Sequence, residues 1–443
     1  SSRRAPGRGA LPSRSRPCAS PAAATMQAAL AAAAALCGVT VARGAPGAIQ
    51  GALDAITGQR PGSTPEGFRE CTVSSGGCGV SQMPRDVTTL VYPGGATGCL
   101  DPDAPEYRFQ VIPGDLDKVV IQFQGGGLCW SDETFHLGVC IIRALPDQKG
   151  IFERREGNPF LNFTLVNVLY CSGDAHSGNA SAPFGRQAGL DNTRAVLDWT
   201  LANFPGVDTL VLSGSSAGSL AVQIHARQIL TSYAGRYRSA VVLADSAAGV
   251  SPAGMEPTIT RQYLCQTPMV LDAGFGEQCD AGDLAFTDMY RDAMVWFPGV
   301  AFANINSKTD LVQILYYDLW TNLETHDPNI EGIRFYAEAN KIFEAHNAFP
   351  NYVSYQLNGG NHVYLQLDTF FTADPQGPGG SGLVASPALV DWIRGLLGQT
   401  ADPRFTPQSV CDGIRYERSF WSRGLAGVLY CDAAQADKQL RLA

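Results

Sequence analysis

A single sharp turn around Ser216 constrains the fold of this chain more than any other feature of the sequence. Branched apolar residues at 210–212 predict a buried strand, which leads into the motif Gly-Ser-Ser-Ala-Gly at 214–218 and then into a helical pattern at 217–230. A chain that reverses this sharply between strand and helix favours glycine on both sides of the serine. We therefore predict an exposed Ser216 hydroxyl beside the positive N-terminal end of a helix. A glycine-rich turn without chemistry is the alternative interpretation.

Strands and helices alternate on both sides of this turn, which predicts an α/β fold. The sheet is expected to be mostly parallel, with helices on both faces, because alternating elements favour that arrangement. Strands are expected at residues 87–92, 107–112, 118–123, 163–170, 210–212, 237–245, 300–305 and 352–357. Helices are expected at residues 190–203, 217–230, 284–296, 333–346 and 387–397.

The two ends of the chain differ from the predicted core. Residues 1–44 are predicted to be a targeting segment, with a signal peptide that starts at Met26 and has a short apolar run at 28–41. An organellar transit peptide is the rival, because residues 1–17 are rich in Arg and Ser and contain no acid. Residues 45–67 are expected to be a linker, 68–402 the catalytic domain, and 403–443 an extension held by a disulfide.

Ten cysteines remain after the targeting segment, and their even number favours disulfides. They are spread along the chain without the close pairs that a zinc site requires, so we expect no metal and an oxidising compartment. Cys265 with Cys279 and Cys411 with Cys431 are sensible local pairs, and buried free thiols are the alternative. The ten are Cys71, Cys78, Cys99, Cys129, Cys140, Cys171, Cys265, Cys279, Cys411 and Cys431. Two glycosylation sequons, at Asn162 and Asn179, agree with secretion.

The overall charge argues against a nucleic-acid partner. The formal net charge is -9, and all six charged residues before position 45 are Arg, so the rest of the chain carries about -9 - 6 = -15. An acidic protein without a basic stripe does not suit a phosphate backbone. No apolar run reaches the length of about 18 residues that predicts a membrane span, and we expect a monomer.

A nucleophilic serine requires a base and an acid that orients the base. In sheet enzymes of this kind, the acid and then the histidine follow the serine along the chain, each after a strand. Of the six histidines, only His362 follows a predicted strand beyond Ser216. Asp310 and Asp245 each lie near the end of a strand, and each also suits a helix N-cap or a buried hydrogen-bonding role. Spacing gives Asp310 only a slight preference.

The oxyanion of an acyl-transfer reaction requires backbone N–H donors near the serine. Ala217, the residue after the nucleophile, is expected to supply one of them. The glycine run 125–127 ends an earlier predicted strand, where a second donor is expected, although such a run alone is usually only a turn.

Five stretches together resemble the pectin acetylesterase and Notum family of carboxylesterases. They keep the order and spacing of the family from about residue 85 to 370. The stretches, with the family pattern in parentheses, are 123–129 (F-E-G-G-G-W-C), 170–178 (Y-C-x-G/S-D-x-x-S-G), 214–218 (G-S-S-A-G), 243–246 (L-A/S-D-S/A) and 310–314 (D-x-W-Q-I).

The resemblance implies an α/β-hydrolase-like fold, secretion, no cofactor and no metal. It also implies Ser216 as nucleophile, His362 as base and Asp310 as acid, with Asp245 in a structural motif. The oxyanion donors that it implies are Gly126, Gly127 and Ala217.

Some positions depart from the family pattern. Gln124 replaces a Glu, and Leu128 replaces a Trp that would form an aromatic wall of the substrate site. Leu128 is therefore a candidate substrate-binding residue. Asp174 and His176 are further candidates, because they lie on a loop that would line the pocket. The equal alternative is that their side chains make hydrogen bonds that shape this loop.

These observations lead to three hypotheses. The first is a secreted serine carboxylesterase that removes acetyl groups from extracellular or cell-wall polysaccharide. The second is an O-deacylase that removes a longer acyl chain from a lipid or protein. The third is an inactive, disulfide-rich binding protein on a hydrolase scaffold, which predicts that Ser216, His362 and Asp310 do not assemble.

Overall fold

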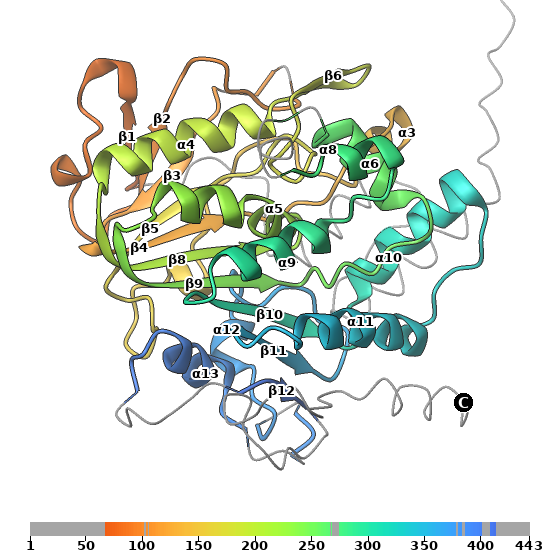
Figure 1. Cartoon of the computed structure of the whole chain (residues 1–443). Coiled ribbons are helices and arrows are strands. Elements are labelled where there is room, and N and C mark those ends of the chain that lie inside the picture. Colours follow the sequence, from red (N-terminus) through yellow and green to blue (C-terminus); the bar gives the residue numbers. More distant parts are fainter. Residues whose placement is uncertain are drawn as a thin grey trace, which may run out of the picture.

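The computed structural model describes residues 67–412 except for 102, 105, 266, 268–273, 378–379, 383–385 and 401–407 (Figure 1). The targeting segment 1–44 lies outside these residues, as do the linker up to residue 66 and the extension apart from 408–412. The assignments of those segments stay predictions.

A ten-stranded sheet forms the centre of the molecule, in the order β1-β2-β3-β5-β4-β8-β9-β10-β11-β12. Neighbouring strands run parallel, except that β3 is antiparallel to both β2 and β5. The predicted mostly parallel sheet is therefore confirmed. The strands are β1 (Arg69–Thr72), β2 (Thr89–Tyr92), β3 (Phe109–Ile112), β4 (Asp115–Phe123), β5 (Phe163–Val168), β8 (Val207–Ser215), β9 (Tyr237–Asp245), β10 (Ala301–Ser307), β11 (Tyr352–Leu357) and β12 (Val410–Cys411). A separate small sheet pairs β6 (Ala180–Ala182) with β7 (Gly185–Gln187).

The order of the strands fixes where a ligand can bind. The chain passes from β4 to β5 on one side of β4 and returns to β8 on the other side. In an open parallel sheet, the crevice lies at the carboxyl ends of the strands where the order reverses in this way. Phe123 at the end of β4 pairs with Gly214 near the end of β8, so the glycine run and Ser216 emerge at one crevice.

Helices cover both faces of the sheet, as predicted. They are α3 (Asp132–Leu137), α4 (Gly189–Asn203), α5 (Ala217–Ser232), α6 (Met255–Tyr263), α8 (Gly276–Ala281), α9 (Phe286–Trp296), α10 (Leu311–Trp320), α11 (Gly332–His346), α12 (Thr369–Thr372) and α13 (Leu389–Leu396). Short 3-10 turns are η1 (Val73–Ser75), η2 (Val80–Gln82) and η3 (Gly150–Phe152), and α10 continues into a π-helical turn, η4 (Thr321–Thr325).

Alternate residues of the central strands supply the two halves of the core. Ile121 and Leu212 point to the face covered by α4, α5, α9 and α11, where α4, α5 and α9 lie in front of the strands in Figure 1. Val120 and Val211 point to the opposite face, where they share a core with Trp392 of α13. This alternation follows from the period of two in a strand, and both sets are fully buried.

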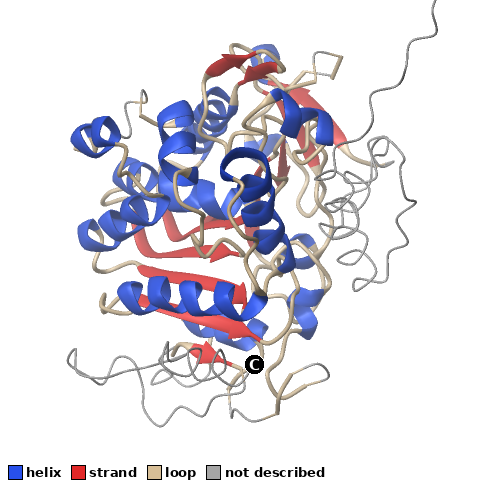
Figure 2. Cartoon of the chain, turned by 90° about the vertical axis from the view of Figure 1, so that its right-hand side faces the viewer, coloured by secondary structure: helices blue, strands red, loops and turns tan. Residues whose placement is uncertain are grey.

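A third apolar cluster lies apart from these two. It joins the segment after the glycine run, including Leu128, to α6, α8 and α10. Figure 2 shows, from the side, the helices and loops that gather around the strands. This cluster packs over the crevice and supplies part of the wall of the cavity there.

Disulfide bonds link loops and short elements around the central sheet. The described bonds are Cys71–Cys78, Cys99–Cys171, Cys129–Cys140 and Cys265–Cys279, so the predicted Cys265–Cys279 pair is confirmed. Cys411 is also disulfide-bonded, whereas Cys431 lies outside the described residues.

The observed elements differ from the predicted ones chiefly at the edges. β9 and β11 have the predicted bounds. β1, α3, α8 and β12 carry too few residues for a periodic pattern, and α6 is a longer helix that we did not predict. β12 pairs with β11 through Val410 and Cys411, so the central sheet continues past the domain boundary that we placed at residue 402.

The two predicted sequons lie at the surface. Asn162 and Asn179 are both exposed, and their glycosylation stays a prediction. Among the helices that the structure describes, none combines the length and the apolar character needed to cross a bilayer.

Candidate active site

Ser216 sits in a strained turn between β8 and α5. Its backbone has φ 56° and ψ -123°, a conformation that non-glycine residues rarely adopt. A side chain at Gly214 would overlap the backbone of Gly218, and one at Gly218 would overlap the carbonyl of Phe123. The two glycines are therefore required by close backbone packing.

His362 lies between Ser216 and Asp310. Its Nε2 is 2.7 Å from Ser216 Oγ, and its Nδ1 is 2.9 Å from each carboxylate oxygen of Asp310. His362 follows β11 and Asp310 follows β10, so parallel neighbouring strands deliver both side chains to the same edge of the sheet. The arrangement allows His362 to accept the proton of Ser216 while Asp310 stabilises the resulting imidazolium.

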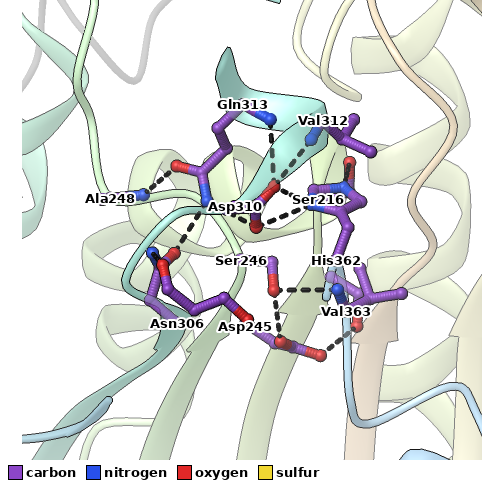
Figure 3. A network of polar contacts seen from close by, with 12 residues as sticks. Ser216, Asp245, Ser246, Ala248, Asn306, Asp310, Val312, Gln313, His362 and Val363 are labelled. Atoms are coloured by element: carbon purple, nitrogen blue, oxygen red, sulfur yellow. Dashed lines mark hydrogen bonds and ion pairs between the residues drawn. The ribbon is translucent and has the colours of Figure 1, made fainter. Parts of the chain in front are cut away.

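Asp310 is held by more than His362. It is the N-cap of α10, and its Oδ1 accepts hydrogen bonds of 3.0 Å from the backbone N–H groups of Val312 and Gln313. Its Oδ2 accepts one of 2.9 Å from Gln313 Nε2, and Gln313 is itself fixed by Asn306 and by the N–H of Ala248 (Figure 3). The helix cap and the partner of His362 are therefore one carboxylate.

Asp245, the rival acid, faces the same loop but does not contact His362. Its Oδ2 accepts 2.8 Å hydrogen bonds from the backbone N–H groups of Tyr364 and Leu365. Its Oδ1 accepts a hydrogen bond from Ser246 Oγ, which in turn accepts one from the N–H of Val363 (Figure 3). Burial raises the pKa of Asp245. This carboxylate therefore holds the segment that carries His362.

The segment after His362 requires such support. Val363 has φ 58°, and a β-branched residue is strained in this left-handed conformation. Ser246, which binds its N–H, has φ 65°. Backbone strain of this kind persists only where surrounding contacts fix the conformation.

The predicted oxyanion donors lie in one region. Gly127 and Ala217 both line the cavity beside Ser216, while Gly126 does not. Gly127 has φ 77° and its carbonyl accepts a 2.8 Å hydrogen bond from Tyr170 Oη, which fixes the peptide that follows it. A side chain at Gly127 would overlap the carbonyl of Val139. The role of these three residues as donors stays a prediction.

The cavity beside Ser216 has about 660 Å³ of empty space that is continuous with the solvent. Leu128 lies in its wall, where we expected a substrate-binding residue. Its apolar wall also includes Leu220, Val250, Met255, Phe286 and Val312. The lining as described contains no Lys and no Arg. Such a cavity suits an apolar, uncharged group.

Glu256 is the acid in this wall. It is half-buried in the first turn of α6. Burial, with a smaller contribution from Asp288, raises the pKa of Glu256 to about 7, and a hydrogen bond from Ser251 and the charge of Arg291 oppose the rise. The charge of the wall therefore changes near neutral pH.

Asp174 and His176 do not line the cavity. Asp174 is fully buried and accepts hydrogen bonds from Ser172 Oγ and the N–H of Gly189, at 2.6 and 2.8 Å. His176 is also buried, and its Nε2 lies 2.8 Å from the carbonyl oxygen of Gln124. Burial lowers the pKa of His176 to about 3, so it is neutral at physiological pH. Both side chains shape the loop, as in the alternative that we gave.

Other residues of the site were not predicted from the sequence. In the sequence, Glu256 has the pattern of an ordinary acid in the first turn of a helix. Tyr316, which also lines the cavity, is one aromatic residue in an apolar helical stretch. Gln313 stands in one of the motifs that carry the resemblance, which was the available signal for its contact with Asp310. Within the described part of the chain, no group of three or more His, Cys, Asp or Glu side chains is placed to hold a metal ion.

Comparison with known proteins gives three similarities. The sequence model of the Pectinacetylesterase family matches residues 87–330, a range that includes Ser216 and Asp310. Pectin acetylesterase 7 of Arabidopsis thaliana is 27% identical over 152 residues, which cover 29% of this chain and 36% of that protein. The match thus spans little more than a third of the relative. The Wnt deacylase Notum from Drosophila has a TM-score of 0.46 and 15% identity, covering 68% of this chain and 90% of that one.

The two candidate acids predict different effects on the reactivity of Ser216. Asp310→Asn should slow labelling of Ser216 by a fluorophosphonate roughly 10³–10⁴-fold, because the amide no longer holds His362 in the required tautomer. Asp245→Asn should slow labelling only about 10-fold or less, because Asp245 acts on His362 only through the backbone of the segment that follows it. Labelling rates would measure the two effects. Equal slowing in both variants would contradict this assignment.

Proposed function

The chain belongs to the pectinacetylesterase family, and from this membership and the geometry of its site we propose that it is a serine carboxylesterase. It hydrolyses O-acyl esters through an acyl-enzyme on Ser216. The observation that carries the proposal is the position of His362, with Nε2 2.7 Å from Ser216 Oγ and Nδ1 2.9 Å from Asp310.

The reaction begins when Ser216 Oγ attacks the ester carbonyl carbon. His362 Nε2 takes the hydroxyl proton, and Asp310 stabilises the imidazolium. The tetrahedral intermediate then expels the alcohol, which receives the proton from His362. A water molecule attacks the acyl-enzyme with His362 again as base, and the acid leaves as Ser216 regains its proton.

The oxyanion of both tetrahedral intermediates requires fixed donors. We assign this role to the backbone N–H groups of Ala217 and Gly127, which both line the cavity, with Gly126 as the third candidate. Ala217 is the first residue of α5, so the positive end of that helix adds to the stabilisation.

An acetyl ester of extracellular polysaccharide is the first candidate substrate. The name of the matched family and of the Arabidopsis relative denotes acetyl groups on pectin. A longer acyl chain is the second candidate, and the apolar wall of the cavity, with Leu128 in place of an aromatic residue, favours it. An inactive binding protein is disfavoured, because it predicts that Ser216 and His362 lie apart.

The proposed destination is the secretory pathway, with secretion to the cell exterior or the cell wall. The disulfides support an oxidising compartment. A plastid or another compartment of the secretory pathway stays the alternative. The acidic charge continues to disfavour nucleic acid as a partner.

Replacement of the serine tests the reaction itself. Ser216→Ala should lower kcat for p-nitrophenyl acetate by about 10³-fold or more, because the nucleophile is lost. Ser232→Ala, at the other end of α5, is the matched control and should keep the full rate. The proposal fails if purified wild-type protein releases p-nitrophenol no faster than Ser216→Ala.

A series of p-nitrophenyl esters tests the acyl group. We expect the highest kcat/KM between acetate and butyrate, because in the acetyl assignment the sugar, and not a long acyl chain, occupies the apolar cavity. Leu128→Trp should lower the rate with butyrate relative to acetate, because a larger side chain narrows the wall. A maximum at eight carbons or more would reject the acetyl assignment in favour of a long acyl chain.

The charge of the cavity wall predicts a pH-dependent choice between esters. The pKa of Glu256 is about 7, so its carboxyl is neutral below that pH and negative above it. The ratio of kcat/KM for p-nitrophenyl hemisuccinate to that for the butyrate should therefore fall about 10-fold as the pH rises from 6 to 8. A pH effect that is common to both esters cancels in the ratio. Glu256→Gln should give a flat ratio, and a fall that persists in this variant would contradict the role of Glu256.

A further inference from the structure

Asp147 places one carboxylate between two segments that form the active site. It lies on the loop that precedes η3 and is 9% exposed. Its Oδ2 accepts hydrogen bonds from three amide groups, those of Gln124, Asn167 and Gln366, at 2.8, 2.9 and 2.5 Å. Asp147 takes no direct part in the chemistry described above.

Two of these amides belong to the active-site loops. Gln124 immediately precedes the glycine run, and Gln366 follows the segment that carries His362. Gln366 also reaches across, because its Oε1 accepts a 3.4 Å hydrogen bond from the N–H of Gly125. One carboxylate oxygen therefore joins the proposed oxyanion loop to the histidine segment.

Residues of the central sheet fix the position of Asp147. Both backbone groups of Asp147 bind the side chain of Gln110 on β3, with its N–H donating to Oε1 at 3.0 Å and its carbonyl accepting from Nε2 at 2.7 Å. Asn167 on β5 donates to both Asp147 and Gln110. These contacts tie Asp147 to the rigid sheet, so a loop that binds its carboxylate takes its position from the sheet.

Gln124 transmits this position to the loop. Its Oε1 accepts a 2.9 Å hydrogen bond from the N–H of Tyr170, and its Nε2 donates to Asp147 and to the carbonyl of Leu145. All the polar atoms of its side chain are thus engaged. A shift of the carboxylate would therefore shift the peptide of the glycine run.

We propose that Asp147 is a positioning residue, whose carboxylate sets the glycine run and the His362 segment at the separation that the reaction requires. This inference rests on the proposed esterase function. It predicts that removing the charge disturbs the alignment of the oxyanion donors with the Ser216–His362 pair, and a misalignment of about 1 Å can cost on the order of 10²-fold in rate.

The buried negative charge of Asp147 lowers the stability of the folded state. Burial raises the pKa of Asp147 to about 6, in spite of the three hydrogen bonds that favour the ionised form. When the pKa of a carboxyl is higher in the folded than in the unfolded state, the protonated form favours folding. The stability that this form contributes is lost as the pH rises through about 6. At pH 8 the neutral Asp147→Asn variant should therefore have a Tm equal to or above that of wild type, with the advantage shrinking towards pH 5.

The test compares two variants that disturb the contact between Asp147 and its amides. Asp147→Asn removes the negative charge, and Gln124→Glu sets a second carboxylate against it across the 2.8 Å contact. We expect Asp147→Asn to lower kcat for p-nitrophenyl acetate about 10-fold per Ser216 site counted by fluorophosphonate labelling, with KM changed less than about 2-fold. Gln124→Glu, with two facing carboxylates, should be as impaired as Asp147→Asn.

Two further variants keep the test decisive. Asp208→Asn, in an exposed ion pair with Arg238, is the matched control and should leave kcat unchanged. Gln366→Met removes the bridge from the histidine side alone and should lower kcat per site as Asp147→Asn does, which tests the idea even if Asp147 cannot be replaced.

The outcomes separate this inference from the proposed function. An active wild type with an unchanged kcat per labelled site in Asp147→Asn and Gln366→Met, or with a lowered Tm as the only change, would assign Asp147 a purely structural role. A wild type without esterase activity would overturn the proposed function itself, and this inference with it.

Discussion

The site depends first on the pair of contacts that His362 makes with Ser216 and Asp310. Those three side chains come from the ends of β8, β10 and β11, and a parallel sheet is what brings such distant parts of the sequence to one edge. Asp310 is held by the first turn of α10 as well as by His362, so the direction of the imidazole is set by a helix that the sheet itself positions. The reactive geometry is therefore a property of the sheet and its first flanking turns.

Backbone strain accompanies this geometry and is balanced by buried polar groups. Ser216, Ser246 and Val363 all have positive φ, which costs on the order of 1–3 kcal/mol each. The hydrogen bonds that fix these residues come largely from Asp245, which binds the backbone beyond Val363 and whose own carbonyl accepts from the N–H of Ser216 at 2.8 Å. The conformation of the histidine segment is thus tied to the end of β9.

The sequence predicted the parts of the site where chemistry dictates the residue type. Ser216 in its glycine turn and His362 after β11 could be located from pattern and order. The choice between Asp310 and Asp245 could not be made from spacing, because β9 and β10 are adjacent parallel strands and deliver both acids to the same edge. Asp174 and His176 were placed in the pocket because their loop also starts at that edge, but it folds inward. No sequence pattern around Glu256 predicts a place in the cavity, because that place depends on how α6 packs over the crevice.

The carboxyl groups around the site differ in role because they differ in what covers them. Asp310 and Asp245 are fully buried against backbone donors, and Asp147 is buried against side-chain amides, so each fixes one loop relative to the sheet. Burial raises the pKa of Asp245 and of Asp147 in spite of those hydrogen bonds, so above that pKa each ionised carboxyl is less favourable in the fold than in the unfolded chain. Glu256 is instead open to the cavity wall, where its charge meets whatever group the cavity holds. The buried acids therefore hold the loops of the site relative to the sheet, whereas the cavity wall is formed by helices that pack over the crevice.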